Sequence, residues 1–422
     1  MLLRDFYMVF CEKYVMLQSK SQNILKLALK NTTLPHRKET SMIRIGILGA
    51  TRGLNFAFAA KKYSLNLEIS AVCDCFQPLL GKVKAQLPSL GYAPVFFADY
   101  REMLAKADID AVVIANNANE HAPAAIEALK SGRHVLSECL PTQTPGEAVE
   151  LVNAVEQSGK RYSYAENYCY FPANFEAALR FRRGDIGTLV EAEGDFINDC
   201  SQRWHLLTRG NRDHWRNFVP ATFYCTHSIG PMLYAIRQRP VRVCCFELPC
   251  QDYMRVHGAR SGSAALEMIE LESGAYIKSL HGNLKRPWVT RMQLYGTLGT
   301  LEVRDANRLD LYMENDGKNG FINSEIAEYT RIPGIPEKII GVPDAMEMWC
   351  FLGAIEGNPV ALEYGVDVWS ALQMSLPGLY AHRSVLEGSG SVEIPDVRNP
   401  DGRKTMRGDN LLCNCIKRIC LW

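Results

Sequence analysis

Residues 43–53 read IRIGILGATRG, an apolar run that passes directly into a turn with two glycines. Such a run predicts a buried β-strand, a glycine turn and the start of a helix. A second apolar run ends at Asp74, about twenty residues farther along the chain. Glycines let the backbone approach a pyrophosphate, the free N–H groups of the helix bind it, and the carboxylate accepts the ribose hydroxyls. The spacing therefore predicts a dinucleotide-binding unit.

The glycine turn departs from the usual G-x-G-x-x-G pattern. Thr51 occupies the place of the second glycine, and the last glycine, Gly53, comes one residue early. A strand-to-helix turn without a ligand would also fit this stretch. We expect Gly49, Thr51, Arg52, Gly53 and Asp74 to bind NAD rather than NADP, because the carboxylate would repel the extra phosphate. Arg52, beside the turn, would weaken that preference.

The composition excludes several kinds of partner. Among 422 residues, 47 basic side chains balance 46 acidic ones, so the chain has no net field that would attract nucleic acid or an acidic membrane. The 14 cysteines are scattered without C-x-x-C spacing, which indicates reduced thiols and a cytoplasmic protein. Cys413, Cys415 and Cys420 lie close together, but no histidine stands at ligand spacing, so we expect no metal site. A small-molecule ligand is the expectation that remains.

The two ends of the chain differ from its middle. Residues 1–41 mix charged and apolar residues and lack a signal-peptide cleavage pattern, so we expect an extension outside the folded unit. Residues 395–422 begin with Arg, Asp, Gly and Asn in quick succession, which is typical of a disordered tail. No apolar run approaches the roughly 18 residues that a membrane span needs.

Between these ends, the pattern predicts an α/β protein of two domains. In residues 42–163, short β-branched runs alternate with helical ones, which is typical of a doubly wound, parallel Rossmann sheet. Its expected strands are residues 43–48, 67–73, 95–97, 111–115, 134–136 and 162–164. In residues 164–394, strand-like runs and turn glycines precede a helix-rich stretch from Asp344 to Glu387. We expect this substrate and oligomerisation domain to be α+β, with a large, mostly antiparallel open sheet.

Several motifs in a fixed order carry a family resemblance. They are FADYREML at 97–104, DIDAVVIA at 108–115, EHAP at 120–123, HVLSE at 134–138 and QLYGTLGTL at 293–301. Together they resemble the glucose-fructose oxidoreductase, inositol dehydrogenase and MocA family over residues 42–392. The resemblance implies a Rossmann domain that holds NAD or NADP and a largely antiparallel second domain that completes a site for a sugar or polyol.

Two departures from this family affect the expected chemistry. Its dehydrogenases have a lysine and a proline after the glutamate that matches Glu138, and the lysine assists proton transfer; here Cys139 and Leu140 follow the glutamate. Cys139 would act as a packing residue or as a proton shuttle, and neither replaces a lysine well. Residues 223–231, FYCTHSIGP, resemble instead the NAD-dependent glycoside hydrolases typified by α-N-acetylgalactosaminidases, as does AENYCY at 165–170.

Three side chains are candidate catalytic residues: His227, Tyr224 and Glu166. Hydride chemistry belongs to a nicotinamide, so the protein must supply a base for the hydroxyl proton. His227 would otherwise be a satisfied core histidine at the start of an apolar helix, but its place in a known site motif favours a functional role. Glu166 ends a strand at the expected crevice, where an acid–base role and a structural ion pair are both open.

Further candidates follow from their positions near these residues. Four side chains are expected to bind substrate: Asn167, Tyr168, Trp215 and Arg216. Three more are expected to contact the cofactor: Asn116, His121 and Glu138. An aromatic face stacks on the C–H surface of a pyranose, but Trp215 and Arg216 would equally fit a domain-packing cluster. The polar loop before His121 is equally explained by helix capping from Asn119 or Glu120.

Three functions are compatible with these residues. We expect first an NAD-dependent oxidoreductase that acts on a secondary hydroxyl of a sugar or polyol. The alternative is an NAD-dependent glycoside hydrolase, in which oxidation acidifies a C–H, elimination expels the aglycone, water adds and the hydride returns. A third is an inactive cofactor-binding regulator, since fold alone does not decide. A dimer or tetramer is expected, because open sheets bury their faces and edges by association.

Overall fold

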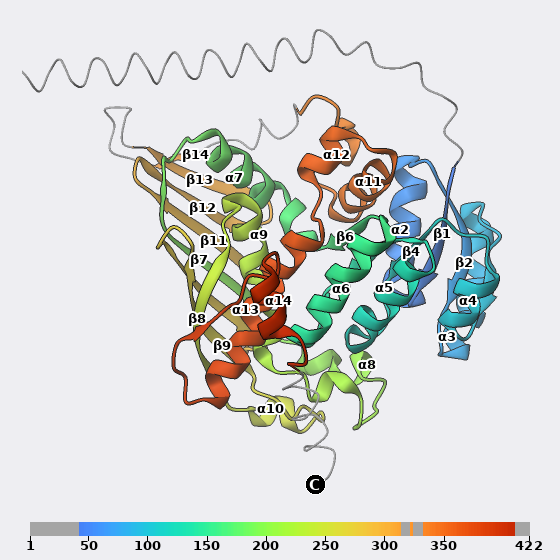
Figure 1. Cartoon of the computed structure of the whole chain (residues 1–422), viewed down its shortest axis with the longest axis horizontal. Helices are drawn as coiled ribbons and strands as arrows, with labels where there is room; N and C mark the ends of the chain where they lie inside the picture. Colours follow the sequence, from blue (N-terminus) through green and yellow to red (C-terminus); the bar gives the residue numbers. More distant parts are fainter. Residues whose placement is uncertain (1–41, 314–320, 324–331, 410–422) are drawn as a thin grey trace, which may run out of the picture. The chain divides into compact units, whose positions relative to one another are not determined.

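The computed structural model describes residues 42–313, 321–323 and 332–409. The expected N-terminal extension, residues 1–41, lies outside these ranges. The described elements form two sheets with associated helices (Figure 1). None of the helices in these ranges has the length and the apolar character that a bilayer crossing requires.

The first sheet has six parallel strands in the order β3-β2-β1-β4-β5-β6. Its strands are β1 (Ile43–Leu48), β2 (Leu67–Cys73), β3 (Val95–Phe97), β4 (Ala111–Ile114), β5 (His134–Glu138) and β6 (Tyr162–Ala165). The helices between them are α2 (Ala50–Tyr63), α3 (Gln77–Gln86), α4 (Tyr100–Lys106), α5 (His121–Lys130) and α6 (Pro145–Ser158). The strand order reverses between β1 and β4, which is where open sheets of this kind bind ligands. The predicted Rossmann sheet is confirmed.

The turn between β1 and α2 requires glycine at positions 49 and 53, for different reasons. Gly49 has a φ of +94°, and a Cβ there would lie 2.3 Å from the backbone of Ala115, just after β4. A Cβ on Gly53 would lie 2.4 Å from Cγ2 of Ile47. The first glycine lets the turn approach β4, and the second lets α2 pack closely on β1. The N-terminus of α2 therefore faces the crevice at the ends of the strands.

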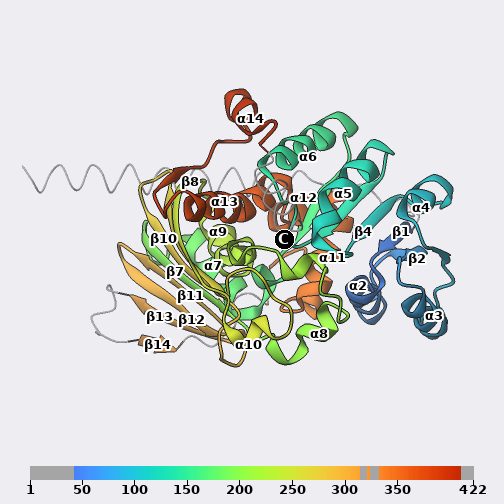
Figure 2. The same ribbon diagram turned by 90° about the horizontal axis from the view of Figure 1, so that it is seen from below.

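The second sheet has nine strands in the order β14-β13-β12-β11-β7-β10-β9-β8-β15. They are β7 (Leu189–Ile197), β8 (Pro240–Leu248), β9 (Ala264–Leu271), β10 (Tyr276–Gly282), β11 (Val289–Gly296), β12 (Gly299–Asp305), β13 (Arg308–Met313), β14 (Phe321–Asn323) and β15 (Val392–Glu393). Among the described strands of this second sheet, only β7 and β10 pair in parallel. One face packs against α7 (Pro172–Arg183), α9 (Thr226–Ile236) and α13 (Val368–Leu386) (Figure 2). The predicted, mostly antiparallel sheet is confirmed.

Helix α11 (Pro343–Glu356) returns from the second half of the chain to the first sheet. Its Met348, Phe351 and Leu352 are buried in one cluster with Ile47 of β1 and Phe56 of α2. The short helix α12 (Pro359–Tyr364) follows and packs on α11. The range expected for the second domain, residues 164–394, thus supplies part of the core of the first. The last strand of the first sheet, β6, also extends past the boundary expected at residue 163.

The tail expected to be disordered, residues 395–422, is partly helical. Helix α14 (Pro400–Met406) begins after Asn399, whose side chain accepts a hydrogen bond from the backbone N–H of Asp401. Arg403 forms an ion pair with Glu156 of α6 at 2.7 Å, and Met406 is fully buried. These tertiary contacts order a segment whose composition alone indicates disorder. Residues 410–422 lie outside the described ranges.

Candidate active site

A cavity of about 480 Å³ collects candidate residues from distant parts of the sequence. Seven of the expected site residues line it: Arg52, Glu138, Asn167, Tyr168, Arg216, Tyr224 and His227. Its size matches a small-molecule ligand. Arg52 and Glu138 come from the first sheet and its helices, and His227 comes from α9. The pocket therefore lies where the carboxyl ends of the parallel strands meet the second half of the chain.

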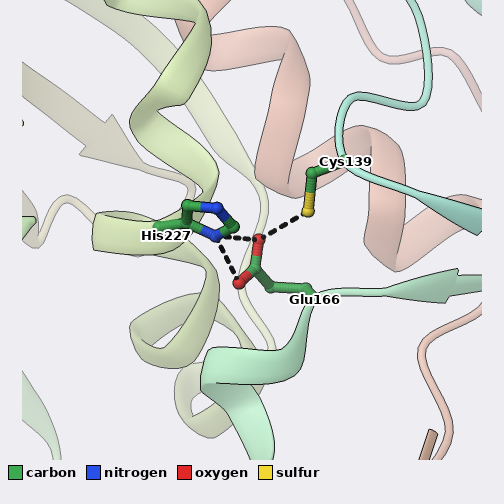
Figure 3. A group of neighbouring side chains, drawn as sticks. All are labelled: Cys139, Glu166 and His227. Carbon is green, nitrogen blue, oxygen red and sulfur yellow. Dashed lines mark hydrogen bonds and ion pairs between the residues drawn. The ribbon is translucent and has the colours of Figure 1, made fainter. Parts of the chain in front are cut away.

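A carboxylate and an imidazole form the centre of this site. Glu166 directly follows β6, and its side chain is fully buried. Nδ1 of His227, in the first turn of α9, lies 2.8 Å from Oε1 and 3.1 Å from Oε2 of Glu166 (Figure 3). The rings of Tyr168 and Phe196 pack on His227 at 4.5 and 4.8 Å. A neutral His227 that donates from Nδ1 carries an unprotonated Nε2, which is the form of a general base.

Cys139 occupies the other side of the same carboxylate. Its Sγ lies 3.3 Å from Oε2 of Glu166 and 3.5 Å from the carbonyl oxygen of Ala165 (Figure 3). Burial raises the pKa of the Cys139 thiol well above its usual value, and the nearby Glu166 adds to the effect. The thiol is therefore neutral and donates to Glu166. This position favours packing and hydrogen bonding over proton shuttling.

The aromatic wall of the pocket differs from the one expected. Trp215 is absent from the lining; it packs against the main core, with the Arg216 guanidinium 4.7 Å from its ring. The packing alternative therefore accounts for Trp215. Arg216 lines the pocket and donates a hydrogen bond to the hydroxyl of Tyr224. Trp204 provides an aromatic wall instead, and its indole N–H donates to Oδ1 of Asn217 at 2.8 Å.

Several lining residues were not anticipated from the sequence. Asn198 follows β7, Arg203 ends the short 3-10 helix Ser201–Arg203, Trp204 begins α8 (Trp204–Leu207), and Asn283 follows β10. None of them lies in a motif, and the loops come together only because β7 and β10 are paired neighbours in the second sheet. Polar amides and a guanidinium suit a hydroxylated ligand, because they donate and accept several hydrogen bonds.

Asp74 is buried beside the glycine turn. Its Oδ2 accepts a hydrogen bond from the backbone N–H of Ala50 at 2.9 Å, and its Oδ1 accepts one from that of Phe76 at 2.9 Å. The carboxylate therefore fixes the start of α2 in addition to any ligand role. Each carboxylate oxygen can accept a second hydrogen bond, so the side chain can still receive a ribose hydroxyl.

Asn116 lies in the loop after β4, and its backbone N–H adjoins Gly49. Its amide group donates to Glu120 at 2.8 Å. Its buried Oδ1 has no hydrogen-bond partner within the described part of the chain. An unpaired polar atom next to a turn that only glycine can form fits a dinucleotide, which would supply donors there. The residues present thus fit the cofactor that the sequence predicts.

Arg52 is held by carboxylates that the sequence did not connect to it. Its Nε lies 2.6 Å from Oε1 of Glu138, and its Nη2 lies 2.7 Å from Asp344 and 3.9 Å from Glu347. Burial raises the pKa of both Glu138 and Glu347. Asp344 and Glu347 belong to α11, so this cluster ties α11 to the start of α2. Arg52 was expected to weaken the preference for NAD over NADP. Its pairing with these carboxylates makes it less available to bind the extra phosphate of NADP.

Two of the expected cofactor residues are placed differently. His121 is 1% exposed, and its Nδ1 and Nε2 face the carbonyl oxygens of Leu140 and Asn116 at 3.0 and 3.3 Å. Burial lowers the pKa of His121 to about 4, so the ring is neutral. It connects two loops through contacts with backbone oxygens and is absent from the pocket lining, and its contact with the cofactor stays a prediction. Thr51 is exposed in the first turn of α2.

Comparison with known protein families agrees with the predicted resemblance. Residues 43–166 match the family model described as an oxidoreductase family with an NAD-binding Rossmann fold. A glycosyl hydrolase family 109 protein from Saccharopolyspora erythraea is 24% identical over 393 residues, which cover 84% of this chain and 83% of that protein. Another, from Shewanella baltica, is 29% identical over 203 residues, 45% of this chain and 43% of that protein. The resemblance to the oxidoreductase family and to its glycoside hydrolase branch is confirmed.

Solved structures share the fold. An NAD binding oxidoreductase from Klebsiella pneumoniae superposes with a TM-score of 0.67 at 19% identity, covering 84% of this chain and 99% of that one. Levoglucosan dehydrogenase in complex with NADH and levoglucosan gives 0.66 at 18%, with coverage of 84% and 99%. The WlbA dehydrogenase from Bordetella pertussis, in complex with NADH and UDP-GlcNAcA, gives 0.68 at 17%, also with 84% and 99%. Both sheets therefore occur together in known dehydrogenases.

Proposed function

We propose that this chain, an NAD-binding oxidoreductase of the glucose-fructose oxidoreductase, inositol dehydrogenase and MocA family, transfers a hydride to or from a secondary hydroxyl of a sugar or polyol. The observation that carries the proposal is the Glu166–His227 pair, joined at 2.8 Å, with His227 on the wall of a cavity of about 480 Å³. A hydroxyl carbon cannot lose a hydride unless a base takes the hydroxyl proton. The pair provides that base beside the crevice where a nicotinamide would bind.

The proposed cofactor site is the turn after β1 together with the ends of β2 and β4. Gly49 and Gly53 would let the pyrophosphate approach the N-terminus of α2, and Asp74 would accept the ribose hydroxyls. Asn116 would use its unpaired Oδ1 to accept a hydrogen bond. When bound, the nicotinamide supplies the hydride chemistry. We prefer NAD to NADP because Asp74 would repel a 2′-phosphate and Arg52 is already paired with carboxylates.

Proton handling is assigned to residues of the second half of the chain. Nε2 of His227 takes the hydroxyl proton, and the Glu166 carboxylate stabilises the resulting imidazolium. The hydroxyl of Tyr224 accepts a hydrogen bond from the Arg216 guanidinium at the pocket wall, and Tyr224 is the second proton-handling group of the proposal. Asn167 and Tyr168 would bind further hydroxyls of the substrate.

A second candidate is NAD-dependent glycoside hydrolysis at the same site. Curated relatives named glycosyl hydrolase family 109 proteins favour it, one of them aligned over 84% of this chain. Transient oxidation of a hydroxyl carbon would acidify the neighbouring C–H, and the aglycone would leave by elimination. Water would then add and the hydride would return, so no reduced cofactor would accumulate. His227 would again take the hydroxyl proton in the first step.

A panel assay tests both candidates. The purified chain is incubated with sugars, polyols and aryl glycosides, with and without added NAD, while reduced nicotinamide and free aglycone are both followed. Accumulation of reduced nicotinamide without cleavage supports the dehydrogenase. NAD-dependent aglycone release without net reduction supports the glycosidase. Binding of NAD without either reaction across the panel would favour the inactive regulator and contradict the proposal.

A further inference from the structure

Three side chains of the site bring different donor atoms together. Cys139 contributes a sulfur, Glu166 a carboxylate and His227 an imidazole nitrogen, and the three donor atoms lie within 4.8 Å of one another (Figure 3). Nδ1 of His227 is 2.8 Å from Oε1 of Glu166, and Sγ of Cys139 is 3.3 Å from Oε2. Cys139 and His227 both line the pocket. The arrangement thus joins three potential metal ligands at an accessible wall.

These separations are close to those inside a metal site. Zinc binds thiolate, imidazole and carboxylate at about 2.0–2.3 Å, which places neighbouring ligands of a tetrahedron about 3.3–3.5 Å apart. Sγ of Cys139 and Nδ1 of His227 lie 3.3 and 3.1 Å from the same oxygen, Oε2 of Glu166, so these two separations are close to the tetrahedral values, and all three donor atoms lie within 4.8 Å of one another. The three residues sit on separate elements, since Cys139 follows β5, Glu166 follows β6 and His227 begins α9. Each side chain can therefore rotate without moving the other two, and such rotations would draw the sulfur and the nitrogen toward a shared ion.

The donor set selects the class of ion. A thiolate and an imidazole favour Zn²⁺ and its spectroscopic substitute Co²⁺, whereas Mg²⁺ and Ca²⁺ favour oxygen ligands. Three protein ligands leave a fourth position, which faces the pocket as in catalytic-type zinc sites.

We propose that Cys139, Glu166 and His227 form a reversible binding site for a thiophilic divalent ion such as Zn²⁺, and that the bound ion inhibits the enzyme. Binding of the ion releases the thiol proton of Cys139 to solvent and leaves the His227 proton on Nε2, so that the thiolate, Nδ1 of His227 and the carboxylate of Glu166 become the ligands. The ion then coordinates the atoms of Glu166 and His227 that otherwise form the general base, so this pair can no longer take the proton of the substrate. The binding half of this inference stands alone, and the inhibition half rests on the proposed function.

Cobalt titration of the metal-free full-length chain tests the binding half without cofactor or carbohydrate. We expect an absorbance band from charge transfer between thiolate and Co²⁺, saturating at one ion per chain, and displacement of that ion by Zn²⁺. Cys139→Ser should remove the thiolate band, and His227→Ala should weaken binding by about 10–100-fold or more. Cys200→Ser, which changes another cysteine of the pocket wall, is the matched control and should retain the band.

Absence of the band in the wild-type chain, or its loss in the Cys200 variant but not in the Cys139 variant, would overturn the site. Thermal unfolding of each variant separates lost ligands from lost folding. X-ray absorption of the Zn²⁺-loaded wild type gives a second measurement, with one sulfur expected at about 2.3 Å. The inhibition half fails if bound Zn²⁺ leaves turnover unchanged. Failure to find any turnover would contradict the proposed function and leave the binding result intact.

Discussion

The contact between Glu166 and His227 joins residues that lie 61 positions apart in the chain. Each was a candidate from the sequence alone, because one ends a strand at the crevice and the other lies in a recognisable motif. Their pairing was not foreseen, since it depends on α9 packing against the short helix Asn167–Tyr170 that follows Glu166. The same limit applies to Cys139, which the sequence placed near Glu138 but not beside Glu166. The sequence therefore identified the residues, and the fold assigned their partners.

Replacement of Glu166 by glutamine tests the Glu166–His227 pair, because it changes only one carboxylate oxygen into an amide nitrogen. The amide keeps an oxygen for the N–H of His227 but loses the charge that stabilises the imidazolium. We expect turnover to fall by about 100-fold or more while NAD binding is retained. Steady-state kinetics with the best carbohydrate of the panel, together with an NAD titration, measures both effects. Unchanged turnover would remove Glu166 from the proton-handling pair.

Asp74→Ala tests the cofactor assignment. The substitution removes the proposed ribose contact and leaves the N–H groups of Ala50 and Phe76 without their acceptor. We expect more than tenfold weaker NAD binding, with a loss of stability of about 1–3 kcal/mol. Asp74→Asn keeps one acceptor oxygen and should lose less stability. Calorimetric titration with NAD and thermal unfolding separate the two roles, and wild-type NAD affinity in the alanine variant would contradict the assignment.

His121 shows why the orientation of a single side chain is hard to predict from sequence. Its position in a polar loop after a strand suggested the cofactor, but both ring nitrogens face backbone carbonyls and the ring is 1% exposed. Sequence position tells which loop a side chain belongs to. It does not tell whether the side chain points into the crevice or back into the loop. The two tryptophans give a second example. Trp204 lines the pocket and Trp215 does not, and this difference depends on how the folded loops orient their side chains.

At the scale of elements, the glycine turn is the part of the first sheet that tolerates least change. Gly49→Ala would place a Cβ 2.3 Å from the backbone of Ala115 at a φ of +94°. We expect a loss of more than about 1 kcal/mol in stability and loss of NAD binding, because the turn must move. Gly81→Ala is the matched control in α3, where a Cβ meets nothing within 4 Å, and it should stabilise by up to about 1 kcal/mol. Chemical denaturation measures both, and equal effects would contradict this account of the turn.

Strand β9 carries a buried carboxyl group that makes stability depend on pH. Burial raises the pKa of Glu267 well above its ordinary value of 4.5. Nε2 of His281 lies 3.6 Å from its Oε1, and burial lowers the pKa of His281 to about 4, so that ring is neutral near pH 7. An acid whose pKa is raised in the folded state stabilises that state fully below 4.5 and loses this contribution as pH rises. Glu267→Gln mimics the protonated form and removes this dependence.

We therefore expect the Glu267→Gln variant to be more stable than the wild type at about pH 8, by on the order of 1 kcal/mol or more. The difference should shrink as pH falls toward 4.5. Urea denaturation at several pH values measures it. The titration of His281 occurs in both proteins and cancels to a first approximation. A stability difference that is independent of pH would show that Glu267 does not titrate in this way.

At the scale of the whole molecule, α11 connects the two sheets. Phe351 is fully buried in the core of the first sheet, although it lies in the second half of the chain. Phe351→Ala should cost about 3–5 kcal/mol and weaken NAD binding, because the helix also carries the carboxylates that hold Arg52. Leu362→Ala, at an exposed position of the neighbouring helix, should change stability by less than about 0.5 kcal/mol.

Calorimetry of thermal unfolding tests whether α11 couples the two sheets. If α11 couples the sheets, both should unfold in one transition that NAD shifts upward. Two separate transitions, with only one affected by Phe351→Ala, would show that the sheets fold independently. The sequence predicted both sheets because alternating apolar runs report local elements. It did not predict the return of α11 or the ordered helix α14, since both depend on contacts such as Arg403–Glu156 across long separations.

The most direct test of the account is single-turnover detection of reduced nicotinamide on the NAD-loaded chain mixed with the carbohydrate panel. We predict a reduced-nicotinamide signal in the wild type, lasting for a dehydrogenase and transient for a glycosidase. The signal should be absent in His227→Ala, which should still bind NAD. An NAD-loaded wild type that never forms reduced nicotinamide, or a His227 variant that forms it at the wild-type rate, would contradict hydride transfer through the Glu166–His227 site.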